Sequence, residues 1–271
     1  MEDLFEEIVK IRKAGGDAAL ATITVASGST PRRIGSKMLI RSDGSIVGTV
    51  GGGGLEAQVL KEAMKVIKGG APRLLHFDPT GKEVAEEGMI CGGKSAVFVE
   101  PITSNPCLYI FGGGHVSFYM AKTAKMVGFR VVVADDRPEF ASRERFPDAD
   151  EIMVDNFSSA LQRLRINKNS YIVILTSGHF SDEEVLEWAV KTDAPYIGMI
   201  GSKKKKDTIF SHLQSKGISR DVLERVHSPI GLEIDAETPE EIAVSILAEV
   251  IKVRRAQKPV ERRPGKLNYA N

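Results

Sequence analysis

The sequence predicts an α/β protein with a parallel sheet in its C-terminal part and a smaller α/β domain in its N-terminal part. Two observations lead to this prediction. The apolar strand Leu108–Phe111 runs through three glycines into an amphipathic helix, and a second apolar strand follows at 130–134. Short apolar strands and amphipathic helices then alternate over 151–200, as is typical of parallel sheets with crossover helices. The C-terminal domain is therefore expected to be Rossmann-like.

A short polar segment separates this pattern from the N-terminal part. Residues 101–106 read PITSNP, a composition that is typical of linkers. We therefore expect an N-terminal domain at 1–103 and a C-terminal domain at 104–271.

The composition excludes several classes of protein. The chain has 271 residues, and its 37 lysines and arginines nearly cancel its 36 aspartates and glutamates, which argues against a nucleic-acid partner. No apolar run approaches the length that crosses a membrane. The two cysteines lack the spacing of a zinc site, and no metal ligands are predicted. Few cysteines and no signal-peptide pattern indicate a cytoplasmic protein, for which we expect a homodimer.

The N-terminal domain is expected to begin with an amphipathic helix at 3–13. Its apolar residues Leu4, Phe5, Ile8 and Ile11 recur at helical spacing and are expected to face inward. The Asp43-Gly44 pair predicts a hairpin between its flanking strands. The other elements expected in this domain are strands at 18–26, 37–40, 45–50, 72–77 and 95–100 and a helix at 55–68.

The glycine turn after the strand Leu108–Phe111 is the first candidate site. Glycines let the backbone approach a phosphate closely, and the N-terminus of the following helix offers unpaired N–H groups to an anion. An acid about 20 residues further on can accept hydrogen bonds from a ribose. Serine stands where the third glycine of this fingerprint is usual, and the alternative is a turn whose site is empty or altered. The residues expected to bind a phosphate-bearing ligand such as a nucleotide are Gly112, Gly113, Gly114, His115, Ser117 and Asp135.

Two loops of the N-terminal domain form a second candidate site for an anionic ligand. One carries an arginine pair, and the other has four consecutive glycines at the entry to a helix. Ordering four glycines costs backbone entropy, which favours a functional reason for them. The alternative is a solvated basic loop beside a flexible turn. The residues proposed for this site are Arg32, Arg33, Gly51, Gly52 and Gly53.

Cys91 is a candidate for sulfur or metal contact. It lies beside Gly92 and Gly93, where local N–H groups can favour the thiolate. A thiolate can hold sulfur, contact a soft metal or attack an electrophile. The alternative is a small buried apolar residue at a strand entry, which is the role expected of Cys107.

Two further segments follow strands of the predicted parallel sheet. Residues 176–179 read TSGH, and Gly201, Ser202 and Lys203 open a run of four lysines. Ligands bind at the carboxyl ends of such strands, so both segments are expected to face the same crevice as the glycine turn. The alternatives are a surface histidine and a solvated helix start.

Two capping boxes are expected in the C-terminal domain. Ser181 with Glu184 predicts a helix that ends at Val190, and Thr238 with Glu241 predicts a helix that runs to about Arg255.

Seven sequence blocks together resemble the xanthine dehydrogenase accessory protein family, of the XdhC/CoxI type. The match spans nearly the whole chain in family order. The blocks that carry it are SGSTPRRIGSKMLIRSDGSIVGTVGGGGLE (27–56), ICGGKSAVFVEP (90–101), YIFGGGHVS, VADDRPEF, YIGMIGSKKKK, HSPIGLEI and ETPEEIAVSILAEV.

The resemblance implies an N-terminal accessory domain, a C-terminal Rossmann domain and a non-catalytic role in maturing molybdenum hydroxylases. Such proteins bind molybdenum cofactor as cargo, support its sulfuration with a cysteine desulfurase and help to insert it into the apo-enzyme. Many relatives have cysteine where this chain has Gly54. If that thiol matters for sulfur handling, this chain relies on Cys91 or works differently.

Two other functions stay open at this point. An NAD(P)-dependent oxidoreductase would use the Rossmann crevice, although the sequence shows no Tyr-x-x-x-Lys pair and no clear acid–base dyad. In that case Asp135 favours NAD and Arg137 leaves NADP open. The third function is a binding scaffold whose nucleotide site is vestigial.

Overall fold

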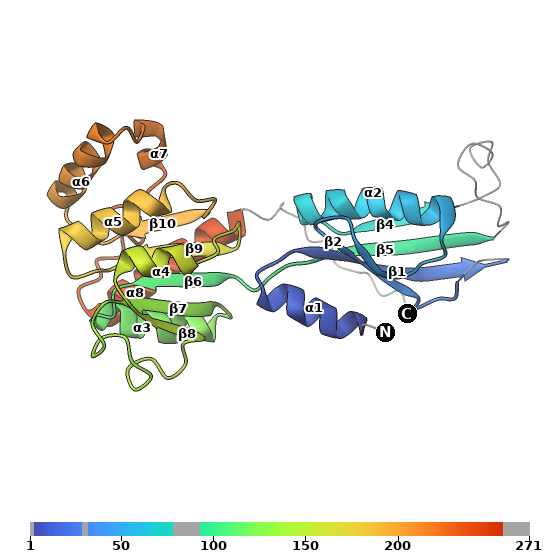
Figure 1. Ribbon diagram of the computed structural model, residues 1–271, viewed down its shortest axis with the longest axis horizontal. Helices are drawn as coiled ribbons and strands as arrows, with labels where there is room; N and C mark the ends of the chain where they lie inside the picture. Colours follow the sequence, from blue (N-terminus) through green and yellow to red (C-terminus); the bar gives the residue numbers. More distant parts are fainter. Residues whose placement is uncertain (1–2, 29–31, 78–92, 257–271) are drawn as a thin grey trace, which may run out of the picture. The chain divides into compact units, whose positions relative to one another are not determined.

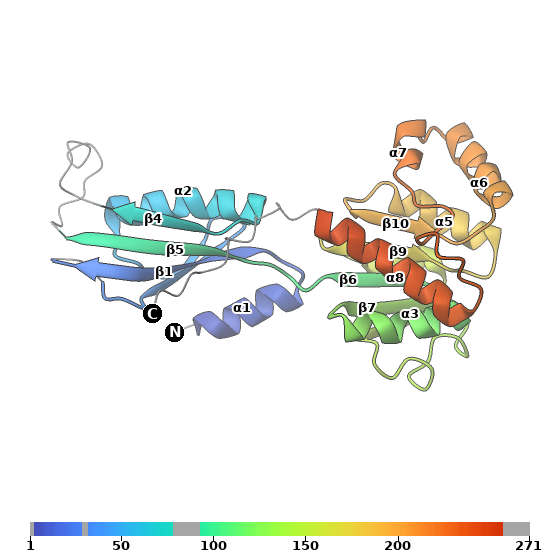
Figure 2. The same ribbon diagram turned by 180° about the vertical axis from the view of Figure 1, so that it is seen from behind.

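The computed structural model describes residues 3–28, 32–77 and 93–256. The chain divides into two compact units between Ser104 and Asn105 (Figures 1 and 2). Each unit has its own five-stranded sheet and its own hydrophobic core.

The N-terminal unit has an antiparallel sheet with strand order β3-β2-β1-β5-β4. One face of the sheet packs against the helix α2, which spans Gly53–Gly69 and buries Leu55, Val59, Ala63 and Val66. The expected hairpin is present, because β2 and β3 pair on either side of Asp43 and Gly44. The strands are β1 (Ala18–Ser27), β2 (Lys37–Arg41), β3 (Ile46–Gly48), β4 (Arg73–Phe77) and β5 (Lys94–Ile102).

The helix α1 (Leu4–Lys13) begins where the sequence places it, with the Asp3 carboxylate accepting a hydrogen bond from the Phe5 amide at 2.8 Å. Its apolar side is less covered than expected. Phe5 is 61% exposed, and no residue of the helix is fully buried. The expectation that Phe5 faces inward is therefore wrong. A salt bridge from Glu7 to Arg41 of β2 at 2.9 Å helps to hold the helix.

The C-terminal unit has a fully parallel sheet with strand order β10-β9-β6-β7-β8. The chain runs outward from β6 through β7 and β8 and then returns to place β9 on the other side of β6. This reversal makes the carboxyl ends of β6 and β9 the topological switch point, where ligands bind in such sheets. The strands are β6 (Cys107–Phe111), β7 (Arg130–Asp135), β8 (Glu151–Val154), β9 (Ser170–Ile174) and β10 (Tyr196–Met199).

Helices cover both faces of this sheet, which confirms the Rossmann-like fold class (Figures 1 and 2). On one face, α3 and α8 bury residues such as Met120 and Ile246. On the other face, α4 to α7 bury residues such as Phe157, Val185 and Leu213. The helices are α3 (His115–Met126), α4 (Phe157–Arg163), α5 (His179–Ala189), α6 (Lys203–Ser215), α7 (Arg220–Glu224) and α8 (Pro239–Ala256).

One of the two expected capping boxes is present. The Glu241 carboxylate accepts a hydrogen bond from the Thr238 amide at 3.0 Å, and the Thr238 hydroxyl accepts one from the Glu241 amide at 3.3 Å. The box at Ser181 is wrong, because α5 begins two residues earlier at His179 with Gly178 as its N-cap. The side chain of Asp182, in the first turn of this helix, is fully buried.

Within 3–28, 32–77 and 93–256, no helix combines the length and the apolar character needed to cross a bilayer.

Candidate functional site

The glycine turn connects β6 to α3 at the switch point. A side chain at Gly112 would collide with the backbone of Leu175, which follows β9, and the φ of Gly112 is +102°. A side chain at Gly113 would collide with the backbone of Phe140. A Cβ added at Gly114 would have no neighbouring atom within 4 Å. The protein's own packing therefore requires the first two glycines, and only Gly114 of the three lies at an open surface.

Asp135 ends β7 beside this turn and is 1% exposed. Its Oδ2 accepts hydrogen bonds from the Gly113 amide at 2.7 Å and from Arg137 Nη2 at 2.9 Å. Its Oδ1 accepts hydrogen bonds from the Arg137 amide at 3.0 Å and from Arg137 Nε at 2.9 Å. A carboxylate has about four lone-pair sites, so the protein already uses the full acceptor capacity of Asp135.

Burial alone would raise the pKa of Asp135. The hydrogen bonds from Arg137 and Gly113 outweigh that burial and hold the pKa below its ordinary value of 3.8. Asp135 is therefore an ionised group that anchors the glycine turn.

A loop after β7 lies over the glycine turn and brings a second arginine to it. Arg145 Nε donates a hydrogen bond to the Gly113 carbonyl at 2.8 Å. Its guanidinium also lies 5.6 Å from the centre of the Phe140 ring. Arg145 forms no ion pair with a described residue, whereas Arg137 is paired with Asp135. Arg145 therefore leaves an uncompensated positive charge at the turn.

The N-terminus of α3 lies beside this charge. No described side chain caps it, and its first turn carries no acid. His115 is exposed at this end of the helix. Ser117 is fully buried, and its hydroxyl has no hydrogen-bond partner among the described residues. An uncapped helix N-terminus next to an arginine is a site suited to a phosphate group.

An ion pair between a buried carboxylate and a partly exposed lysine joins the carboxyl ends of β9 and β10. Asp182 of α5 is 0% exposed, and its Oδ1 accepts a hydrogen bond from the Thr176 hydroxyl at 2.6 Å. Lys205 of α6 forms a salt bridge with the Asp182 Oδ2. Lys205 Nζ also approaches the Ile200 carbonyl at 3.4 Å. This network fixes α5 and α6 against the ends of their strands.

The predicted residues at the end of β10 surround this ion pair. The Ser202 hydroxyl caps α6 by accepting a hydrogen bond from the Lys205 amide at 3.3 Å. Lys203 is exposed and has no ion-pair partner in the described part of the chain. Gly201 has a φ of +158° and packs against the Lys205 side chain. Of these three, Lys203 alone offers a free cationic group.

The glycine run of the N-terminal unit, Gly51 to Gly54, donates a hydrogen bond to a carboxylate of the protein itself. Glu56 Oε1 accepts hydrogen bonds from the Val50 amide at 3.1 Å and from the Gly51 amide at 3.3 Å. The Thr49 hydroxyl donates to the same oxygen. Burial raises the pKa of Glu56, but these hydrogen bonds outweigh it and lower the pKa overall. In this structure Glu56 occupies the anion position that the glycine run creates.

The remaining residues of this candidate site are less constrained. Gly52 and Gly53 have positive φ, and an added Cβ at either meets nothing within 4 Å. Arg32 and Arg33 are exposed in the loop before β2. Gly54 lies in the first turn of α2 and is not among the glycines with positive φ. The backbone at this position therefore accepts cysteine without strain.

The two cysteines differ in what the structure says of them. Cys91 lies outside the described residues. Cys107 is buried at the start of β6, as expected. Burial raises the pKa of the Cys107 thiol to about 11, so this thiol is protonated at neutral pH and is not a nucleophile.

The HSPIGLEI segment is fixed to α8 by Glu249 and by Ser245, whose hydroxyl donates a hydrogen bond to the Leu232 carbonyl at 2.6 Å. Glu249 accepts hydrogen bonds from the Tyr196 hydroxyl at 2.7 Å and from the Gly231 amide at 2.9 Å. His227 Nδ1 lies 3.0 Å from the other Glu249 oxygen. These contacts hold the segment in place against α8.

Sequence reasoning missed the acids and cations that hold these turns together. Glu56, Arg145, Asp182 and Lys205 were not selected as site residues. A hint existed for Glu56, which lies in the first turn after a glycine run. For the Asp182–Lys205 pair, the only hint was that both follow adjacent strands of the predicted sheet.

Both units of the chain match known protein families. A model described as the XdhC Rossmann domain matches residues 108–250, and a model described as the XdhC and CoxI family matches residues 11–78. A crystal structure described as a xanthine dehydrogenase from Bacillus halodurans is 26% identical, with a TM-score of 0.53. The match covers 94% of this chain and 97% of that chain.

Three relatives among curated proteins are informative. The protein YqeB of Escherichia coli (strain K12) is 34% identical over 93% of this chain and 46% of its own length. A probable xanthine dehydrogenase subunit from Bacillus subtilis (strain 168) is 30% identical over 59% of this chain and 46% of its own length. The chain therefore spans about half the length of these two relatives. The molybdenum cofactor insertion chaperone PaoD of Escherichia coli (strain K12) is 24% identical over 92% of this chain and 87% of its own length.

Proposed function

The chain belongs to the XdhC and CoxI family, and from that premise we propose that it is an accessory chaperone for molybdenum hydroxylases of the xanthine dehydrogenase type. It binds molybdenum cofactor as cargo, supports the sulfuration of the cofactor and inserts it into the apo-enzyme. The observation that carries this proposal is the match to PaoD, which covers 92% of this chain and 87% of that chaperone. A match of this extent includes both units rather than the Rossmann domain alone.

The N-terminus of α3 is the proposed contact for the phosphate of the cargo. It offers backbone N–H groups at Gly114 and His115, and no described side chain caps it. Arg145 adds a positive charge that no described acid neutralises. Together these groups supply the donors and the charge that a phosphate monoester requires. Gly112, Gly113 and Asp135 take the role of positioning this turn.

The other predicted residues keep proposed roles at the cargo. Arg32, Arg33 and Lys203 would contribute cationic donors to it. Cys91 would supply the thiol for sulfur handling, since Cys107 is buried and protonated. Gly51, Gly52 and Gly53 would bind an anion only after Glu56 leaves their amides. Gly201 and Ser202 would shape the surface beside Lys203.

The proposed partners are a molybdenum hydroxylase apo-enzyme, a cysteine desulfurase and a second copy of this chain. The first two are inferred from the family, and the third from the symmetry of most oligomers. Sedimentation at several concentrations tests the homodimer.

The competing function is an NAD(P)-dependent oxidoreductase. The Rossmann-like fold supports a dinucleotide in general terms. The Asp135 carboxylate argues against the usual mode of binding, because Gly113 and Arg137 already occupy its lone pairs. A ribose could gain this acceptor only by displacing the groups that hold the glycine turn.

Reconstitution of an apo-enzyme tests the proposed function. Purified apo molybdenum hydroxylase is mixed with isolated molybdenum cofactor, with and without this protein, and the molybdenum bound to the hydroxylase is measured over time. We expect faster loading with wild type, and slower loading with Arg145→Gln than with the control Arg163→Gln on α4. Loading at the same rate without the protein would contradict the proposal. Adding a cysteine desulfurase and its substrate then separates sulfuration from insertion.

A further inference from the structure

The helix α5 carries an outward stripe of acidic and aromatic residues. Phe180, Glu183, Glu184, Glu187 and Trp188 recur at spacings of three and four, which places them on one side of the helix. The opposite side of α5 packs into the core of the C-terminal unit. Helices usually turn charged residues outward but keep aromatic ones inward. Trp188 is partly buried against the core, so the exposed aromatic residue that requires an explanation is Phe180.

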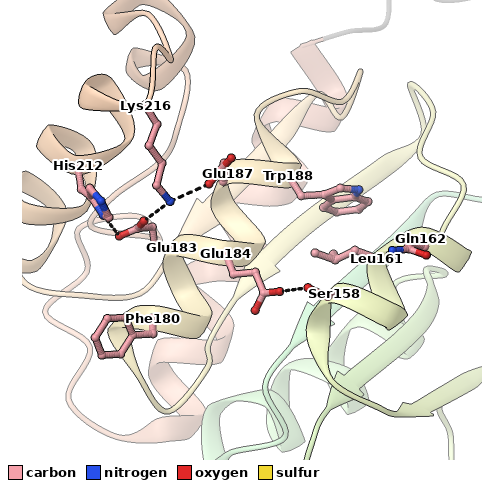
Figure 3. A pocket seen from close by; sticks show the side chains of 10 residues that line it. All are labelled: Ser158, Leu161, Gln162, Phe180, Glu183, Glu184, Glu187, Trp188, His212 and Lys216. Carbon is pink, nitrogen blue, oxygen red and sulfur yellow. Dashed lines mark hydrogen bonds and ion pairs between the residues drawn. The ribbon is translucent and has the colours of Figure 1, made fainter.

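The stripe forms the floor of a groove between α4 and α6 (Figure 3). The groove has a volume of about 570 Å³, which lies within the range of sites that hold a ligand or a few side chains. Leu161 of α4 lines one side beside Trp188, and Lys216, the residue that follows α6, lines the other (Figure 3).

The acids of the groove exceed its cations. Lys216 Nζ pairs with Glu183 at 2.9 Å and with Glu187 at 3.0 Å, and His212 Nδ1 lies 2.7 Å from Glu183. Glu184 accepts a hydrogen bond from the Ser158 hydroxyl but has no cation among the described residues. Glu187 also pairs with Lys191, which lies outside the groove lining, at 3.0 Å, so three carboxylates are accompanied by two lysines in the described part of the chain. The arrangement leaves room for one more positive charge at Glu184.

The aromatic residues bracket this position. Phe180 is 78% exposed and lies one turn before Glu184. Trp188 lies one turn after Glu184, and its ring makes an edge contact with Phe111 at 5.9 Å, which fixes its orientation. A carboxylate between two aromatic side chains suits a guanidinium, because its planar face stacks on a ring while its N–H groups bond the acid.

We propose that this groove docks an arginine-bearing, partly apolar segment of a partner protein. The arginine stacks on Trp188 and pairs with Glu184, and an apolar side chain of the same segment covers Phe180. Charge complementarity selects a basic partner, and the exposed Phe180 supplies the apolar contact that protein interfaces favour near their centre. The proposal does not depend on cofactor binding, because every residue in it lies on α4, α5 or α6.

Peptide binding tests the proposal. The probes are a short fluorescein-labelled peptide of alternating leucine and arginine pairs, and the same peptide with citrulline, a neutral isostere, at each arginine. We expect saturable binding of the arginine peptide to the full chain and at least tenfold weaker binding of the citrulline peptide. Glu184→Gln and Phe180→Ala should each weaken binding about fivefold, in line with modest exposed contacts.

Matched variants outside the groove serve as controls. Glu224→Gln removes an exposed acid on α7, and Met126→Ala truncates an apolar side chain on α3 that is 80% exposed. Neither control should change the affinity. Absence of saturable binding to wild type, equal affinity for the citrulline peptide, or equal losses in the controls would each overturn the proposal. The rate of cofactor loading of a hydroxylase is measured separately, so failure of peptide binding would not by itself contradict the proposed chaperone function.

Discussion

The Asp135 carboxylate accepts a hydrogen bond from the Gly113 amide at 2.7 Å and joins the end of β7 to the glycine turn after β6. The same carboxylate holds Arg137 through its backbone amide and its guanidinium. The acid at this position usually accepts hydrogen bonds from a ribose in this fold. Here it accepts them from the protein's own glycine turn. This relationship argues against the usual mode of dinucleotide binding and leaves the open end of α3 as the proposed anion site.

Replacing Asp135 with asparagine should destabilise the C-terminal unit. The variant loses a charged acceptor, so we expect the free energy of unfolding at pH 7 to fall by about 2 kcal/mol. The pKa of Asp135 is lowered in the folded state, so its contribution is complete above its ordinary value of 3.8 and is lost as the pH falls through the folded pKa. The difference in the free energy of unfolding between the variant and wild type should therefore become smaller only below pH 3.8.

Urea unfolding followed by tryptophan fluorescence makes this measurement, because the single tryptophan, Trp188, lies in the C-terminal unit. Asp136→Asn is the control, since the side chain of Asp136 is 53% exposed. Equal stability of Asp135→Asn and wild type at pH 7 would show that the hydrogen bonds to Gly113 and Arg137 carry little energy.

Replacing Glu56 with alanine should free the amides of the glycine run. The Val50 amide loses its acceptor, and the Gly51 amide keeps only the Thr49 hydroxyl, so we expect the hydrogen exchange of the Val50 amide in particular to become about tenfold faster. Added phosphate should slow this exchange again in the variant, because the run then binds an external anion. Mass spectrometry of exchanged peptides measures both effects. Glu62→Ala on the same helix is the control, and unchanged exchange in Glu56→Ala would refute the prediction.

Replacing Lys205 with methionine should cost about 3 kcal/mol of unfolding free energy, because it leaves Asp182 charged and buried without its cation and an unpaired buried charge is strongly destabilising. Lys203→Met, two residues away and exposed, should change stability by no more than about 0.5 kcal/mol. The same fluorescence assay reports both variants. Equal losses in the two would mean that the ion pair does not secure α6.

Replacing Ser117 with alanine should stabilise the protein by about 1 kcal/mol. The Ser117 hydroxyl is fully buried, and its oxygen has no partner among the described residues, so its removal relieves a desolvation cost. Alanine is also the better helix former. Thermal unfolding provides the measurement. A loss of stability instead would show that the hydroxyl makes a hydrogen bond that these contacts do not include.

Local patterns account for most of the fold. The hairpin at Asp43 and Gly44, the alternating strands of the parallel sheet and the Thr238 capping box all depend on residues close in sequence, and the structure contains each of them. The Ser181 box failed for a nonlocal reason. Its second residue, Asp182, is buried and pairs with Lys205 of the next helix, and no local pattern shows that partner.

The site was less predictable than the fold for the same reason. The glycines at Gly112 and Gly113 were correctly located at a strand-to-helix turn. The sequence does not show that Leu175 and Phe140 require them, or that Asp135 is saturated by protein donors. Arg145 lies on a loop that contacts the glycine turn. The sequence of a loop gives little indication of which part of the fold it will contact. Such arrangements follow from tertiary packing alone.

Equilibrium binding of isolated molybdenum cofactor, with NAD(H) and NADP(H) as competitors, tests the central claim most directly. The variants are Arg145→Gln at the α3 site and Cys91→Ala for the proposed thiol, with Arg163→Gln as the control. The account predicts that wild type and the control bind the cofactor, that Arg145→Gln weakens binding about tenfold through the lost charged contact, and that dinucleotides do not compete. Tight dinucleotide binding with no binding of the cofactor would contradict the account and would favour hydride chemistry in the Rossmann-like domain.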